Sequence, residues 1–145
     1  MDASRHVAHV ISAGEWLATR ERGTVTLSYA DRCRRRVRVL DDAGVPLLVD
    51  LVYPARLSDG DGLVTADGTI IRVIAKPEPL IEAIATDAQH LQQLAKQVGD
   101  RRVPVQVVDD RSLRIIPNAA LEQMLRGLGA ETRSVTAPFR PESTA

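Results

Sequence analysis

The chain has 145 residues, of which 44% are hydrophobic and only 3% aromatic, and its 19 basic and 19 acidic side chains give zero formal net charge. This balance argues against a dedicated binder of nucleic acids or anionic membranes, which usually carries a basic excess. No apolar run approaches the roughly 20 residues of a membrane span, and no export signal is visible. The single cysteine, Cys33, allows no internal disulfide. We therefore expect a soluble cytoplasmic protein with an aliphatic core.

The first 22 residues have no clear periodicity, which predicts a poorly ordered, solvated terminus. His6 and His9 are three residues apart, so on a helix they would share one face, as a metal-binding pair does. A solvated terminus is the simpler interpretation of both histidines. Trp16 is expected to anchor this segment to the first core.

The rest of the first half shows the alternation and the Gly and Asp turns of short β-strands. Strands are predicted over residues 25–29, 32–40, 46–52, 63–64 and 70–74. In the second of these, the alternation points Cys33 inward and places Arg34, Arg36 and Arg38 on a solvated face. The pattern predicts a small open barrel or sandwich.

The pattern changes at the segment Lys76-Pro77-Glu78-Pro79. Each proline fixes its own backbone and restricts the residue before it, so the segment is predicted to be a stiff, extended connector. We therefore predict a β-rich N-terminal domain over residues 1–76, a second domain over residues 77–136, and an extended tail over residues 137–145.

The second domain alternates strands and helices in the order βαββαβ. Strands are predicted over residues 80–85, 103–108, 113–116 and 131–136, and Asp87 and Asn118 are suited to cap the two helices. The second helix carries an apolar stripe at helical spacing, formed by Leu121, Met124, Leu125 and Leu128. This order predicts a ferredoxin-like domain, in which two helices cover one face of a four-stranded antiparallel sheet. The fold class is therefore α+β.

Motifs of catalysis are missing from the sequence. There is no G-x-S-x-G, no phosphate-binding loop and no G-x-G-x-x-G after a strand. The histidines are scattered, and a lone helical histidine such as His90 is more often a surface residue than a ligand. The residues therefore predict a non-enzymatic module of two domains.

Five segments, in order and at matching spacing, resemble the urease accessory protein family of nickel chaperones, the UreE type. They are residues 57–63, 75–80, 94–106, 121–130 and 138–142. The resemblance implies a small β domain followed by a ferredoxin-like domain, and a homodimer formed through the second domain. It also implies a GTPase and other urease accessory proteins as partners, and nickel as the metal delivered.

The sequence departs from the family pattern where that family binds nickel. By the resemblance, Gln97 and Arg102 occupy histidine positions, and Ala119 occupies the position of the nickel-binding histidine. The implied dimer would place Ala119 near its twofold axis, on a surface shared with Asn118, Glu122 and Arg102. Nickel needs imidazole, thiolate or carboxylate donors, and an alanine methyl supplies none. We therefore expect no metal site at this position.

Three hypotheses follow. The leading one is a UreE-like accessory protein in nickel delivery or in the assembly of a urease-type maturation complex, with the usual nickel site lost. The second is a working nickel chaperone with substitute ligands such as His90, His6 or His9. The third is a ferredoxin-like RNA-binding module, which ranks below the others because the stacking aromatics are missing.

Overall fold

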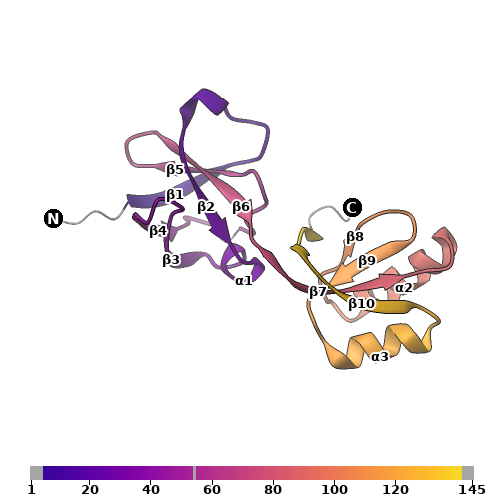
Figure 1. Cartoon of the computed structure of the whole chain (residues 1–145). Coiled ribbons are helices and arrows are strands. Elements are labelled where there is room, and N and C mark those ends of the chain that lie inside the picture. Colours follow the sequence, from indigo (N-terminus) through magenta and orange to yellow (C-terminus); the bar gives the residue numbers. More distant parts are fainter. Residues whose placement is uncertain (1–4, 54, 142–145) are drawn as a thin grey trace. The chain divides into compact units, whose positions relative to one another are not determined.

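Alternating apolar and polar residues build two separate sheets in this protein (Figure 1). The structure is a computed structural model that describes residues 5–53 and 55–141. The chain divides into two units, Met1–Lys76 and Pro77–Ala145, and each is described by itself. The regular structure of the first unit is almost entirely β, while the second combines a sheet with two longer helices, which confirms the predicted α+β class.

The first unit is built on one six-stranded sheet. Its elements are β1 (Arg5–Ile11), the 3-10 turn η1 (Ala18–Arg20), β2 (Glu21–Leu27), α1 (Tyr29–Arg32), β3 (Arg36–Leu40), β4 (Pro46–Asp50), β5 (Gly62–Thr65) and β6 (Ile70–Ala75). The strand order is β2-β6-β5-β1-β4-β3, in which the pairs β1–β4 and β2–β6 are parallel. Aliphatic side chains from all six strands form the core.

The prediction of a poorly ordered terminus is wrong for the described part of that segment. β1 lies inside the sheet between β4 and β5, and Val7 is fully buried. Its pairing partners are more than 35 residues away, for example Leu47 for Arg5, so nothing local in the sequence marks this strand. Trp16 does bind this unit, because its indole Nε1 donates to the carbonyl oxygen of Gly60 at 3.2 Å.

The predicted strand over residues 32–40 is too long at its start. Ser28 caps the one-turn helix α1 by accepting from the Asp31 N–H at 3.2 Å, and β3 begins only at Arg36. The alternation therefore fails before β3: Arg32 is fully buried, and Cys33 is exposed rather than in the core. Arg34, Arg36 and Arg38 are exposed, as predicted for the solvated face.

The second unit follows the predicted order βαββαβ. Its elements are β7 (Pro77–Ile84), α2 (Ala88–Asp100), β8 (Gln106–Val107), β9 (Ser112–Ile115), α3 (Ala119–Gly127) and β10 (Glu131–Pro138). The antiparallel sheet has the order β10-β7-β9-β8. Both helices pack on one face, because Leu94 and Leu125 share a single core with Ile81 and Leu113 of the strands. None of the helices among the described residues is long and apolar enough to cross a membrane.

Both ends of the second unit differ from the prediction. Residues 77–79 are not a connector but the start of β7, where they pair with Pro138, Ala137 and Thr136 of β10. Prolines are tolerated there because β9 pairs with β7 only from Ile81 onward, so among the described residues this part of β7 has a strand partner on one side only. β10 continues to Pro138, and Phe139 is fully buried, so the predicted tail begins later than residue 137.

Candidate functional site

The start of α3 is fixed by local interactions that the sequence predicted. The Asn118 side chain accepts from the Leu121 N–H at 3.1 Å and so caps the helix. Leu121 and Leu125 are buried, whereas Leu128 lies beyond the helix end and is 42% exposed, so the predicted stripe is one residue too long. Ala119, the first residue of the helix, is exposed.

The three positions at which the resemblance implies histidines, Gln97, Arg102 and Ala119, lie at one end of the second unit. His90, near the start of α2, contacts the carbonyl oxygen of Leu128 just after α3 at 2.8 Å, so the helices run in opposite directions. The end of α2, with Gln97 and Arg102, therefore lies at the same end of the unit as Ala119. Arg102 lies just beyond the end of α2, is exposed and takes a left-handed φ of 58°.

The Glu122 carboxylate forms an ion pair and a hydrogen bond on the side of α3 that faces β10. Its Oε2 lies 2.9 Å from Arg126 Nη2 and accepts from the Thr132 hydroxyl at 2.9 Å. Arg126 also donates through Nε to the same hydroxyl at 2.6 Å. This carboxylate is thus held by its own unit.

His90 has a partner at each ring nitrogen. The Thr86 N–H donates to Nδ1 at 3.0 Å, which makes Nδ1 the acceptor and assigns the ring proton to Nε2, the donor to Leu128. The ring thus ties the start of α2 to the end of α3. A metal ion at either nitrogen would have to replace one of these bonds.

The other candidate ligands lie in the first unit. The Nε2 of His6 is 3.9 Å from Asp50 Oδ2, and His9 and Cys33 are exposed. No group of three or more His, Cys, Asp or Glu side chains within residues 5–53 and 55–141 is arranged to hold a metal ion.

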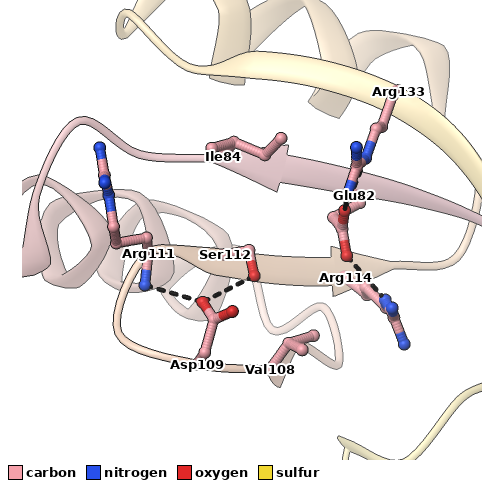
Figure 2. Close-up of a pocket in the computed structure, with 8 residues that line it drawn as sticks. All are labelled: Glu82, Ile84, Val108, Asp109, Arg111, Ser112, Arg114 and Arg133. Atoms are coloured by element: carbon pink, nitrogen blue, oxygen red, sulfur yellow. Dashed lines mark hydrogen bonds and ion pairs between the residues drawn. The ribbon is translucent and has the colours of Figure 1, made fainter.

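Sequence reasoning missed a charged cluster on the second unit. Glu82 of β7 is only 3% exposed and accepts from Arg114 Nε at 3.0 Å and from Arg133 Nε at 2.7 Å (Figure 2). The three residues come from the adjacent strands β9, β7 and β10. The signal in the sequence was a single acidic residue within the apolar run of residues 80–85.

Comparison with known proteins identifies the family. Models of the N-terminal and C-terminal domains of the UreE urease accessory protein match residues 5–76 and 78–145. A urease accessory protein UreE of Chelativorans sp. is 43% identical over 122 residues, which are 84% of this chain and 77% of the relative. Those of Rhodopseudomonas palustris (strain HaA2) and Mesorhizobium japonicum are 42% identical over 122 residues and 38% over 132.

The last two alignments cover 84% and 91% of this chain, and 56% and 67% of the relatives. The chain thus spans little more than half the length of several relatives that it matches. Because these proteins are named accessory proteins, the prediction that the chain is not an enzyme is confirmed. The chain belongs to the UreE family of urease accessory proteins.

Proposed function

We propose that this chain acts in nickel delivery or in the assembly of a urease-type maturation complex, and that it has lost the usual nickel site of its family. The loss of the nickel site is inferred from Ala119, which places an exposed methyl group at the first position of α3. The first part is supported by the family membership and by the accessory role in the names of the relatives.

The groups near Ala119 are poorly suited to hold a divalent cation. Nickel is bound by several converging imidazole, thiolate or carboxylate donors. Here Arg102 contributes a positive charge at the same end of the unit, and the Glu122 carboxylate already bonds to Arg126 and Thr132. His90 could donate to a metal only by giving up a bond that joins the two helices.

The proposal includes a cytoplasmic homodimer formed through the second unit. Its twofold axis would pass near Ala119, on the surface that also carries Asn118, Glu122 and Arg102. Ala119 and Ala120 are exposed and small, so they would allow the two copies of α3 to approach closely. A GTPase and other urease accessory proteins would be the partners.

Calorimetric titration of the tag-free protein with Ni²⁺ and Zn²⁺ tests the lost site. We expect no tight binding near one nickel per dimer. Tight binding that His90→Ala abolishes would overturn the lost site and would support a chaperone with substitute ligands. Circular dichroism of His90→Ala must accompany this test, because the ring also joins α2 to α3.

Restoring a histidine tests the placement of Ala119. Ala119→His should gain measurable nickel binding if two copies face each other across the axis, whereas Ala120→His is a matched control at the next exposed position. Sedimentation of the unmodified protein separately measures the dimer. Equal nickel affinity of the two variants would refute the placement of Ala119, and a monomer would refute the dimer.

A further inference from the structure

A hollow of about 490 Å³ lies on the sheet of the second unit. Ile81, Ala83 and Leu113 point into the core beneath the helices, so the alternate residues Glu82, Ile84 and Ser112, which line the hollow, point to the opposite face. Figure 2 shows Arg111 at one end of the hollow and Glu82 with its two arginines at the other, with Ile84 and Ser112 between them.

The arginines at one end are held in place before any ligand arrives. In the sheet register, Gln106, Arg114, Glu82 and Arg133 follow one another across the four strands. Each oxygen of the Glu82 carboxylate accepts a hydrogen bond from one of the two guanidinium groups. Arg114 bonds to it through Nε, which leaves its two terminal nitrogens available, and neither has a hydrogen bond within the described part of the chain. Fixed guanidinium groups with spare donors suit a planar anion.

The charges that line the hollow leave one positive charge in surplus. Arg111, Arg114 and Arg133 face two carboxylates, Glu82 and Asp109. Asp109 stays ionised at neutral pH, because the Arg111 N–H and then the Ser112 hydroxyl, at 2.9 and 2.8 Å, lower the pKa of its carboxyl. Glu131, opposite Ile84 at the margin of the hollow, adds a further negative charge. This small positive balance suits a single carboxylate better than a doubly charged phosphate.

The surface between the two ends is aliphatic. Ile84 is half-buried, and Val108 is 39% exposed. No aromatic ring is among the eight residues that line the hollow, so it offers no surface on which a nucleic-acid base could stack. An aliphatic side chain next to an acidic one would contact both parts of the hollow.

We infer that this hollow binds an acidic segment of a partner protein. A carboxylate of the segment is bound by the spare donors of Arg114 and Arg133 or by Arg111, and a neighbouring aliphatic side chain rests on Ile84 and Val108. This site is separate from the Ala119 surface, and its test does not depend on the metal content of the protein.

Titration of the ¹⁵N-labelled protein with the peptide acetyl-Gly-Glu-Leu-Gly-amide, followed by NMR, tests the inference. We expect saturable shifts at the amides of Ile84 and Ser112. Arg133→Gln should weaken binding about tenfold, the loss expected for one charge-assisted hydrogen bond. Arg111→Gln should weaken it as well. Both side chains are exposed, so neither change threatens the fold.

Three further measurements sharpen the result. Glu131 of β10 is exposed and lies opposite Ile84 of β7. Glu131→Gln should therefore strengthen binding, because it removes a nearby negative charge. Lys96→Gln is the matched control, since Lys96 lies exposed on α2 on the other side of the sheet and should leave affinity unchanged. Inorganic phosphate should bind more weakly than the peptide.

The inference is overturned by any of four results. They are no binding at millimolar peptide, an equal loss in Lys96→Gln and Arg133→Gln, equal affinity for a peptide with Gln in place of Glu, and tighter binding of phosphate. The last result would assign the hollow to a phosphate group instead.

Discussion

Replacing Glu82 with glutamine removes the charge that holds two arginines on the second sheet. Loss of one partner from a buried ion pair typically costs about 3–5 kcal/mol. The Arg114 side chain is 22% exposed and contributes most of this, whereas Arg133 is 64% exposed, so solvent reduces its share to about 0–1 kcal/mol. We therefore expect Glu82→Gln to lower the free energy of unfolding of the second unit by about 3 kcal/mol.

Urea unfolding followed by far-ultraviolet circular dichroism measures this effect, because the two longer helices, α2 and α3, both lie in the second unit. Glu21→Gln is the matched control in the first unit. Its partner is Arg72, at 2.7 Å, and the two side chains are 30% and 41% exposed. Trp16, the only tryptophan, reports on the first unit, and there we expect a loss of about 1 kcal/mol or less.

A double substitution separates the cost of the unpaired charge from the loss of packing. Replacing both Glu82 and Arg114 with leucine should destabilise the second unit by less than the sum of the two single changes, because no buried charge loses its main partner. A loss below about 1 kcal/mol in Glu82→Gln would refute the reasoning, since this is the range of an exposed pair. Additive single changes would refute it as well.

Two further predictions concern local interactions. Asn118→Ala should cost about 1 kcal/mol in urea unfolding, because the helix loses its cap, and Asn118→Ser should recover most of this; an unchanged midpoint would argue against the cap. Burial alone would raise the pKa of the Asp41 carboxyl, but the Val45 N–H and the Arg5 guanidinium outweigh it and lower the pKa. The stabilisation is therefore complete above about pH 4 and is lost as the pH falls through the lower pKa of the folded state. Tryptophan fluorescence should show a smaller acid loss in Asp41→Asn than in the wild type, and an equal loss in both would refute the contribution of Asp41.

The elements that could be predicted from the sequence are those with local signals. Asp87 and Asn118 cap their helices as expected, accepting from N–H groups three residues later. The buried positions Leu121 and Leu125 repeat at helical spacing. Caps and stripes act within one or two turns, so they are visible in a short window of sequence.

The elements that could not be predicted depend on distant partners or are too short to show a period. β1 is held by β4 and β5, which follow it by dozens of residues. α1 has only four residues, so Arg32 and Cys33 looked like the start of β3. The charged cluster around Glu82 was missed because its partners are distant in the sequence. They lie 32 and 51 residues away, and only the sheet register brings them together.

The implied metal position shows why the fold and the metal chemistry must be tested separately. Ala119 is exposed at the first position of α3, while the cap at Asn118 and the buried residues Leu121 and Leu125 hold the helix. Because this position is exposed, the loss of a histidine that we propose there would cost the fold little. Substitutions there are free of the packing constraints that keep the rest of the helix recognisable. On our proposal, a member of this family loses a nickel donor while its sheet and its helices stay unchanged.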